Sequence, residues 1–365
     1  MTRIGFAYNQ KPDTPAALAA DLGVDAYAEW DSAETIDAVA AALSGLGDVI
    51  RLEATEDFPE RLRRARPDIV FNIAEGLVGP NREAHVPAIC EFLGIPYSGS
   101  DPFTLSLCLH KARTKQMLAA HGIATAPFVL VESRTELDTL VAALAPRGGR
   151  CSDVIPPAPV RFPLFVKPVQ EGSSKGITER NLVRDRDELM ARARELMELY
   201  DQPVLVEEFL PGAEFTCGVL GNGNAAQVLP LVGMRFDALP PGAVPVYGYE
   251  AKWVWDTRDR PLEIFECPAQ VSPELQRAIE DVALRAYRAL GCRDWSRIDV
   301  RLDAAGRPHV IEINPLPGIL PDPAENSGLP KAARAAGMTY DELIQACLVH
   351  AAERQRVPLS RAVAS

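Results

Sequence analysis

The chain has 365 residues, of which 47% are hydrophobic and 24% are charged, and its formal net charge is −12. A chain of this length exceeds what one hydrophobic core usually serves, so two or three packed units are expected. The negative charge argues against a general nucleic-acid binder, which needs a basic face, but it leaves small nucleotides open.

Two features are missing from the sequence. It contains no run of 18 apolar residues, so we expect no membrane span, no membrane partner and a cytoplasmic location. The seven cysteines form neither a CxxC motif nor a cluster with histidine. Reduced thiols are therefore expected, and a zinc site is not.

The N-terminal part alternates strand patterns with helical patterns. Strands are predicted at residues 4–8, 49–52 and 69–73. Asp31 and Glu34 form a capping-box pattern before a helix that Gly47 ends. Strands separated by helices indicate a parallel, Rossmann-like sheet. Glu75 follows the third strand, at the edge where open α/β sheets bind ligands, and is either a substrate contact or an ordinary loop carboxylate.

A longer helix is predicted to begin at Asp101, as its N-cap, and to run to about Ala120. Lys111 and Lys115 fall on one face of this helix, where two like charges gain nothing for its stability. They either bind a phosphate or lie on a solvated face.

A loop and a strand follow. Residues 145–163 hold five prolines and two glycines, which predicts a surface loop. The strand predicted at residues 164–169 carries Lys167 in an apolar run. A buried ammonium needs a partner, so Lys167 is either a phosphate ligand or a lysine whose head reaches water.

The turn at residues 171–176 is rich in small residues, among them Gly172, Ser173 and Ser174. Backbone N–H groups and hydroxyls in such a loop can close over phosphates. The spacing is not that of a Walker A motif, and an ordinary hairpin turn explains the residues equally well.

The strand predicted at residues 204–210 ends in acidic residues. Its edge can present backbone groups to adenine while Glu207 or Glu214 binds ribose or the adenine amino group. The alternative is a plain polar strand end. Lys252 lies among aromatic residues and either binds a phosphate or carboxylate or holds its ammonium in water.

Residues 297–303 alternate between apolar and charged side chains, which is the pattern of a half-buried strand. A turn leads from it into a second strand that begins near Pro308. If Asp303 pairs with Pro308, Asp299 lies opposite Glu312 and Arg297 lies opposite Asn314. Both of these pairings follow from the register that the Asp303–Pro308 pair would set.

Opposed carboxylates repel each other unless a positive charge lies between Asp299 and Glu312. Mg²⁺ suits carboxylate and amide oxygens, with nucleotide phosphates completing its coordination. Arg297 beside them can hold a phosphate or a developing oxyanion. The alternative is a solvent-facing hairpin with hydrated charges.

A series of short motifs carries a resemblance to a known family. In chain order they are Gly94-Ile95-Pro96-Tyr97-Ser98-Gly99-Ser100, His110-Lys111-Ala112-Arg113-Thr114-Lys115, Val166-Lys167-Pro168, Glu171-Gly172-Ser173-Ser174, Glu214-Phe215-Thr216, Tyr249-Glu250-Ala251-Lys252, Arg297-Ile298-Asp299-Val300, Glu312-Ile313-Asn314 and Ala332-Ala333-Arg334-Ala335-Ala336-Gly337-Met338. Their order and spacing resemble the D-alanine–D-alanine ligase family of the ATP-grasp superfamily, over residues 4–350.

The resemblance implies an α/β and α+β fold in which a Rossmann-like domain precedes a two-lobed ATP-grasp unit. The implied parts are the N-terminal domain at 1–107, a central lobe at 108–209 with a flexible insertion at 146–161, a C-terminal lobe at 210–353 and a tail at 354–365. It also suggests a homodimer.

The resemblance further implies a site for ATP. Residues implied to bind the nucleotide are Lys111, Lys167, Gly172, Ser173, Ser174, Glu207, Glu208, Leu210, Glu214 and Lys252. Asp299, Glu312 and Asn314 would bind two Mg²⁺ ions, for which Mn²⁺ can substitute.

Catalytic roles are implied as well. Lys252 would neutralise the transferring phosphoryl group, and Ser174 belongs to the loop that covers it. Arg297 and the Gly318 backbone N–H would stabilise the tetrahedral oxyanion. The residues implied to meet substrate are Glu75, Arg297, Gly318, Ser327 and Gly328.

The implied enzyme is an ADP-forming ligase that joins a small carboxylate to an amine through an acyl phosphate. Four departures from the family concern the acyl pocket. The family's first-loop glutamate, which receives the ammonium of the first D-alanine, has no counterpart after Tyr8. Ala74-Glu75-Gly76 stands in place of the family's His-Gly. Trp253 replaces a tyrosine, and a proline-rich stretch at 319–326 replaces the family's segment before Ser327. We therefore expect an acyl substrate other than D-alanine. The alternatives are an authentic D-alanine–D-alanine ligase of cell-wall synthesis and a non-catalytic nucleotide-binding scaffold.

Overall fold

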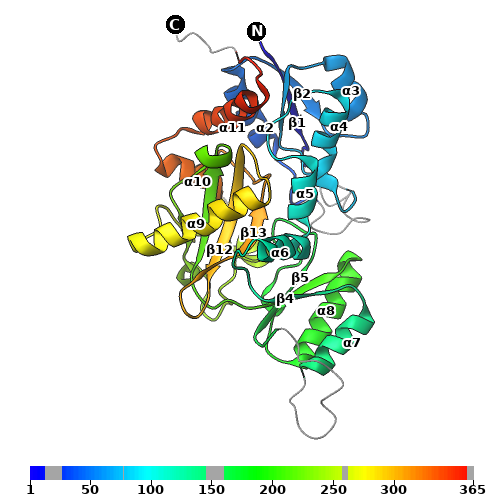
Figure 1. Ribbon diagram of the computed structural model, residues 1–365, viewed down its shortest axis with the longest axis vertical. Coiled ribbons are helices and arrows are strands. Elements are labelled where there is room, and N and C mark those ends of the chain that lie inside the picture. The colour runs from blue at the N-terminus through cyan, green and yellow to red at the C-terminus, as the bar shows by residue number, and fades with distance from the viewer. Residues whose placement is uncertain (13–26, 77, 145–159, 257–261, 360–365) are drawn as a thin grey trace, which may run out of the picture.

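The computed structural model describes residues 1–12, 27–76, 78–144, 160–256 and 262–359. Most of the loop predicted at 145–163, and the end of the predicted tail, lie outside these residues. Three β-sheets organise the described chain, and helices cover them (Figure 1).

The N-terminal sheet has the order β2-β1-β3, and all its strands are parallel, as predicted. Its elements are β1 (Arg3–Tyr8), α2 (Ala33–Ser44), β2 (Asp48–Glu53), α3 (Phe58–Ala65), β3 (Ile69–Asn72), the 3₁₀ turn η1 (Arg82–Ala84) and α4 (His85–Leu93). The predicted cap of α2 is wrong, because Ser32 and not Asp31 accepts the hydrogen bond from the Thr35 N–H. The helix also ends at Gly45, before Gly47.

The single helix predicted after Asp101 is in fact two, α5 (Pro102–Leu109) and α6 (Lys111–Ala120). His110 lies between them with an extended backbone, φ −91° and ψ 90°. Its ring Nδ1 accepts a hydrogen bond from the Arg113 N–H, so His110 caps α6 rather than continuing α5. This break directs Lys111 toward the centre of the molecule.

The second sheet has the order β4-β7-β5-β6 and is antiparallel throughout. Its elements are β4 (Phe128–Val131), α7 (Arg134–Ala143), β5 (Leu164–Pro168), the 3₁₀ turn η2 (Glu179–Asn181), β6 (Leu182–Val183), α8 (Arg186–Tyr200) and β7 (Val204–Glu208). Helices α7 and α8 pack on one face of it (Figure 1), through apolar residues such as Leu137 and Leu189. The other face carries Phe165, Lys167 and Glu207, which line a cavity described below.

The third sheet has the order β11-β10-β8-β12-β13, with β9 paired to β8. Its elements are β8 (Glu214–Leu220), the 3₁₀ turn η3 (Gly223–Ala225), β9 (Gln227–Val228), β10 (Val232–Met234), the 3₁₀ turn η4 (Phe236–Ala238), the π-helical turn η5 (Glu250–Trp255), β11 (Phe265–Glu266), α9 (Pro273–Ala289), β12 (Trp295–Leu302) and β13 (Pro308–Asn314). Helix α9 covers the face that carries Ile298 and Val300 (Figure 1). The prediction that β12 is half-buried is wrong, since Asp299 and Arg301 on its charged face are buried as well.

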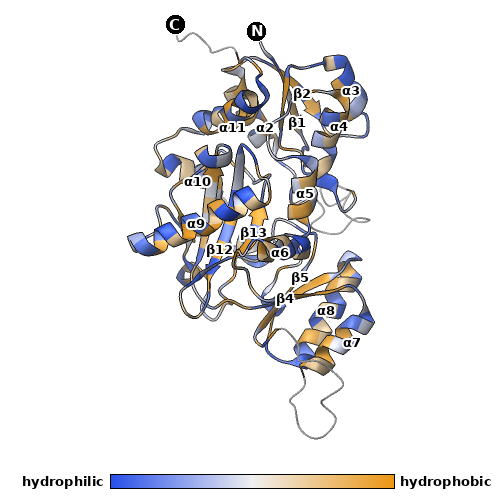
Figure 2. Ribbon diagram, viewed as in Figure 1, coloured by the Kyte–Doolittle hydropathy of each residue, from blue (hydrophilic) through white to orange (hydrophobic). Residues whose placement is uncertain are grey.

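The chain ends with α10 (Gly328–Ala335), which was not predicted, and α11 (Tyr340–Gln355), which begins with a capping box of Thr339 and Glu342. Helix α11 packs against α2 in one apolar core, so the C-terminal helix returns to the N-terminal sheet (Figure 1). Figure 2 shows apolar residues concentrated in the strands and on the inner helix faces. The domain boundaries stay a prediction.

Within the described ranges, no helix combines the length and the apolar character that crossing a membrane requires.

Candidate active site

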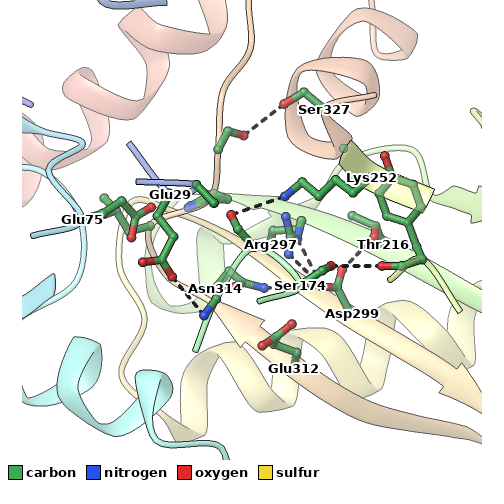
Figure 3. A pocket seen from close by; sticks show the side chains of 18 of the residues that line it. Glu29, Glu75, Ser174, Thr216, Lys252, Arg297, Asp299, Glu312, Asn314 and Ser327 are labelled. Carbon is green, nitrogen blue, oxygen red and sulfur yellow. Dashed lines mark hydrogen bonds and ion pairs between the residues drawn. The ribbon is translucent and has the colours of Figure 1, made fainter. Parts of the chain in front are cut away.

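The hairpin of β12 and β13 forms one wall of a cavity of about 220 Å³. In this hairpin Asp299 pairs with Glu312 and Arg297 pairs with Asn314, as predicted. All four side chains line the cavity, and Figure 3 shows Arg297, Asp299 and Asn314 together at its centre. The solvent-facing alternative is therefore wrong.

The turn of this hairpin differs from the prediction. Leu302, and not Asp303, pairs with Pro308. The carboxylate of Asp303 instead closes the turn, because its Oδ1 accepts two backbone N–H groups at 2.8 and 2.9 Å. A β-bulge at Ile311 then shifts the register by one residue and restores the predicted pairs.

Each of the two opposed carboxylates has a cationic partner. Glu312 Oε1 lies 2.8 Å from Lys111 Nζ, and Arg297 Nη2 donates to Asp299 Oδ2 at 3.1 Å. Thr216 Oγ1 donates to the other oxygen of Asp299 at 2.7 Å. Although burial opposes it, Lys111 lowers the pKa of Glu312 to about 2. Burial raises the pKa of Asp299 despite the attraction of Arg297.

Three lysines converge beside these acids. Glu207 binds two of them, with its Oε1 2.6 Å from Lys167 Nζ and its Oε2 2.7 Å from Lys115 Nζ. Lys111, Lys115 and Lys167 are all buried, so the solvated-face alternative is wrong. Buried ammonium groups held by shared carboxylates form a fixed cationic surface suited to phosphates.

The loop after β5 closes over the cavity. It connects β5 to β6 through residues 169–181, which is longer than a hairpin turn. Ser173 and Ser174 adopt positive φ of 48° and 60°. The Ser174 hydroxyl donates to Tyr247 O at 3.0 Å, and Lys252 Nζ donates to Ser173 Oγ at 3.4 Å. The loop thus contacts the third sheet's connecting segment.

A second cavity of about 130 Å³ adjoins the lysines. Its lining includes the predicted residues Lys111, Lys167, Ser174, Glu207, Glu208, Leu210 and Glu214. The rings of Phe165 and Phe209 add apolar surface. Glu214 is held by Arg301, whose Nη1 donates to its Oε2 at 2.8 Å. An apolar slot next to fixed cations suits a purine with its phosphates.

The remaining predicted residues lie around the first cavity. Ser327 Oγ donates to Gly318 O at 3.1 Å and accepts from the Leu320 N–H at 3.2 Å. Gly328 begins α10, and a Cβ there would come within 2.8 Å of the Thr216 side chain. Glycine at this position lets the helix start approach the carboxylates closely.

Comparison with known proteins decides the family. A family model described as the D-ala D-ala ligase C-terminus matches residues 117–349. A D-alanine--D-alanine ligase from Bordetella petrii is 35% identical over 320 residues, which cover 86% of this chain and 87% of that protein. The chain belongs to the D-alanine–D-alanine ligase family.

Two further members of the comparison extend over nearly the whole chain. An uncharacterized protein from Sinorhizobium fredii is 31% identical over 328 residues, which cover 87% of this chain and 88% of that protein. A crystal structure of D-alanine--D-alanine ligase from Bacillus anthracis complexed with ATP superposes with a TM-score of 0.65 at 22% identity, covering 98% and 99% of the two chains, and supports the fold. The predicted ATP-grasp fold and the predicted class of ATP-dependent, C–N bond-forming ligase are confirmed.

The sequence analysis did not identify Glu29, a carboxylate that lines the cavity. It reaches the cavity from the connection between β1 and α2, further along that connection than residues 9–12, where the family's glutamate was sought. Its partners are the Gly172 N–H at 2.9 Å, Arg82 at 3.0 Å and Lys175 at 3.1 Å. Although burial opposes it, these cations lower the pKa of Glu29.

Sequence reasoning also missed an acidic recess beside Glu29, which Asp31, Glu75 and Glu83 line. Burial, followed by repulsion from Glu83, Glu29 and Asp31, raises the pKa of Glu75 well above its usual value. Burial likewise raises the pKa of Glu83 to about 8 and that of Asp31 to about 7. The sequence singled out Glu75 alone as a possible substrate contact, and Asp31 and Glu83 form no motif with it, so no sequence signal identified the recess.

Proposed function

We propose that this protein is a D-alanine–D-alanine ligase, which joins two D-alanine molecules as ATP becomes ADP and phosphate. The observation that carries the proposal is the convergence of Lys111, Arg297 and Lys252 with the Asp299–Glu312 pair around one cavity. The substrate comes from relatives of that name, such as the one from Bordetella petrii.

The phosphate end of ATP would lie on Lys111 and Lys167, beneath the loop at 172–175. The adenine and ribose would occupy the adjoining cavity near Glu207 and Glu214. Because both oxygens of Glu207 already bind lysines, its main contribution in this proposal is to fix those lysines in place.

The donor set fits magnesium. Asp299, Glu312 and Asn314 supply two carboxylates and an amide from paired strands, and Mg²⁺ commonly binds one or two carboxylates together with substrate phosphates. Across the described ranges, no three His, Cys, Asp or Glu side chains are grouped to hold a metal by themselves, so nucleotide oxygens would complete the coordination. Two Mg²⁺ ions, or Mn²⁺, would offset the charge of the phosphates.

The chain's own residues would act in two stages. Lys252 neutralises charge as the phosphoryl group moves to the donor carboxylate, which makes an acyl phosphate. The amine of the second D-alanine then attacks, and Arg297 with the Gly318 N–H stabilises the oxyanion. Ser327 and Gly328 would hold the carboxylate of the attacking amino acid.

Lys252 gives this proposal a pH dependence. Burial, followed by repulsion from Arg297 and Lys11, lowers its pKa to about 8. The ammonium is charged below that pKa and neutral above it, so kcat/KM for ATP should fall as the pH rises through about 8. Lys252→Arg, which stays charged, should remove this alkaline fall. A profile that is identical in both enzymes would exclude Lys252 as the titrating group.

The donor's ammonium needs a carboxylate, and among the acids that line the cavity we compare Glu29 with Glu75. Glu29 is saturated, since Arg82, Lys175 and a backbone N–H occupy both of its oxygens. Glu75 makes no side-chain hydrogen bond or ion pair with any other described residue, and Figure 3 shows it beside Glu29 on the side of the cavity opposite Lys252. An ammonium bound to Glu75 would also offset the repulsion that raises its pKa.

Glu75→Gln should therefore raise the KM for the donor amino acid by about ten- to a hundredfold, because a charge-assisted hydrogen bond is lost. The KM for ATP should change much less. Steady-state kinetics with each substrate varied in turn measures both constants, and the exposed Glu56→Gln is the control. Equal effects on both KM values would exclude Glu75 as the ammonium partner.

A second candidate function is ligation of a carboxylate other than D-alanine. It is favoured by the rewritten pocket, in which Glu75 stands among other acids and Leu320 and Asn326 from the proline-rich segment line the cavity. Asn326 is held there by Asp256, to which its Nδ2 donates at 2.7 Å.

One experiment separates the candidates. Mg²⁺-dependent ADP release is measured with D-alanine and with a panel of other carboxylates and amines, and products are identified by mass spectrometry. D-Ala–D-Ala formation at an ordinary enzymatic rate, on the order of 1–10³ per second, supports the first candidate. Turnover only with another carboxylate supports the second, and no turnover with any pair would favour a scaffold. The predicted homodimer is tested by sedimentation of the same preparation.

A further inference from the structure

Two segments that are distant in sequence meet beside the cavity. Glu29 and Arg82 belong to the N-terminal part, whereas Gly172 and Lys175 belong to the loop after β5. Glu29 Oε1 accepts from the Gly172 N–H at 2.9 Å and from Arg82 Nη2 at 3.0 Å. Its Oε2 accepts from Lys175 Nζ at 3.1 Å. One carboxylate thus joins the loop to the N-terminal part through a backbone amide and an ion pair.

Arg82 and Gln170 also join the N-terminal part to the residues at the start of the loop. Its Nη1 donates to Gln170 O at 3.0 Å, and the Gln170 side chain donates back to Pro80 O at 3.1 Å. Its Nη2 also lies 3.8 Å from the Glu171 carboxylate. Contacts with the N-terminal part therefore hold the start of the loop as well as its centre.

These ion pairs are shielded from water. The side chains of Glu29, Arg82 and Lys175 are only 6%, 7% and 8% exposed. Removing one partner from a buried set leaves an unpaired charge, which is strongly unfavourable. The set is therefore expected to form or break as a whole when the loop closes or opens.

The loop backbone depends on outside contacts. A Cβ at Gly172 would lie 2.4 Å from Glu29 Oε1, so only glycine allows this approach of the carboxylate. Ser173 and Ser174 have positive φ, which costs non-glycine residues on the order of 1 kcal/mol each. A strained loop of this kind keeps its shape only while its neighbours hold it.

We infer that Glu29 and Arg82 are positioning residues that hold the 171–176 loop closed over the reacting acyl phosphate and so couple ATP use to peptide-bond formation. The inference rests on the proposed function. Neither residue meets the reacting atoms: Glu29 acts through Gly172 and Lys175, and Arg82 acts through Glu29 and the Gln170 carbonyl. Since Glu29 also borders the recess of Glu75, the contacts that close the phosphate side lie next to those proposed for the donor.

The chemical consequence is a choice of nucleophile. With the loop closed, the amine attacks the acyl carbon, the bond from that carbon to the phosphate oxygen breaks, and phosphate leaves. With the loop open, water attacks the same carbon, the carboxylic acid is regenerated, and the net reaction is hydrolysis of ATP to ADP and phosphate. An open loop therefore raises ADP release relative to peptide formed.

The test compares Glu29→Gln, Arg82→Gln and Arg82→Lys with the wild type. The ratio of ADP released to dipeptide formed should rise from about one to about three or more in the two glutamine variants, with partial recovery in Arg82→Lys. The control is Arg134→Gln, which breaks the exposed Arg134–Glu198 pair and should leave the ratio unchanged. A ratio near that of the wild type in Glu29→Gln and Arg82→Gln overturns the inference.

Hydrogen exchange gives a readout that needs no turnover. The backbone amides of 171–176 should exchange about tenfold faster in both glutamine variants, because the contacts that hold the loop are lost. Unchanged hydrogen exchange in both variants would contradict the inference that Glu29 and Arg82 hold the 171–176 loop. If the wild type ligates no amino acids, the proposed function fails, and the inferred coupling of ATP use to peptide-bond formation fails with it. Faster exchange in the two glutamine variants would still support the contacts that hold the loop.

Discussion

Glu312→Gln is expected to lower ADP formation by about a thousandfold or more, since it removes a charge from the centre of the phosphoryl-transfer site. Glu312 has a pKa of about 2, so it is ionised under all ordinary assay conditions. Its carboxylate holds Lys111 at 2.8 Å and is one of the oxygens proposed for Mg²⁺. The amide variant removes the carboxylate that pairs with the buried Lys111 and weakens the proposed metal binding at the same time.

Calorimetry of nucleotide binding, with and without Mg²⁺, separates lost binding from lost chemistry in this variant. Glu274→Gln on α9 is the matched control, because that side chain is 76% exposed and far from the cavity. Turnover of Glu312→Gln at the wild-type rate would contradict both the metal proposal and the role of this acid.

Arg297→Lys is expected to lower dipeptide formation by about a hundred- to a thousandfold while acyl phosphate formation falls much less. A lysine keeps a positive charge near Asp299, but it lacks the planar pair of donors that a guanidinium directs at an oxyanion. The 3.1 Å contact between Arg297 and Asp299 places that guanidinium directly beside the proposed phosphate site.

Positional isotope exchange in ATP with the donor amino acid alone measures the first stage, and dipeptide formation measures both stages. The two readouts should separate in Arg297→Lys, whereas they should fall together in Glu312→Gln. An equal loss in both readouts for Arg297→Lys would mean that Arg297 serves phosphoryl transfer and not the oxyanion.

The hairpin of β12 and β13 shows which structural features the local sequence pattern can predict. Alternation of apolar and charged residues predicted the first strand and the face that carries Arg297 and Asp299, and the turn after it predicted the second strand. The predicted turn was wrong because Asp303 satisfies backbone N–H groups locally, and the bulge at Ile311 compensated for that error. Neither the turn hydrogen bonds nor the bulge has a periodic signature, so only the folded backbone revealed them.

The helix after Asp101 shows a related limit. The sequence predicted the N-cap of this helix and the shared face of its two lysines, but not the break at His110. A histidine that caps a helix with its own ring does not interrupt the helical spacing of the apolar residues, so the pattern gave no sign of the break. The lysines were predicted as phosphate ligands or as solvated residues. Burial decided against solvation, since Glu207 and Glu312 reach them from other strands.

By itself the sequence determined the family, the parallel N-terminal sheet and the opposed acids of the last hairpin, because each is encoded in short motifs or in local periodicity. Tertiary structure alone decided which of the carboxylates around the cavity have cationic partners. Glu29, Glu75 and Glu83 are separated in the chain, and their charges interact only after folding brings them into one buried recess. There, partnership with Arg82 and Lys175 keeps Glu29 ionised, while burial without a partner raises the pKa of Glu75. Such differences depend on distance and desolvation, which residue spacing does not encode.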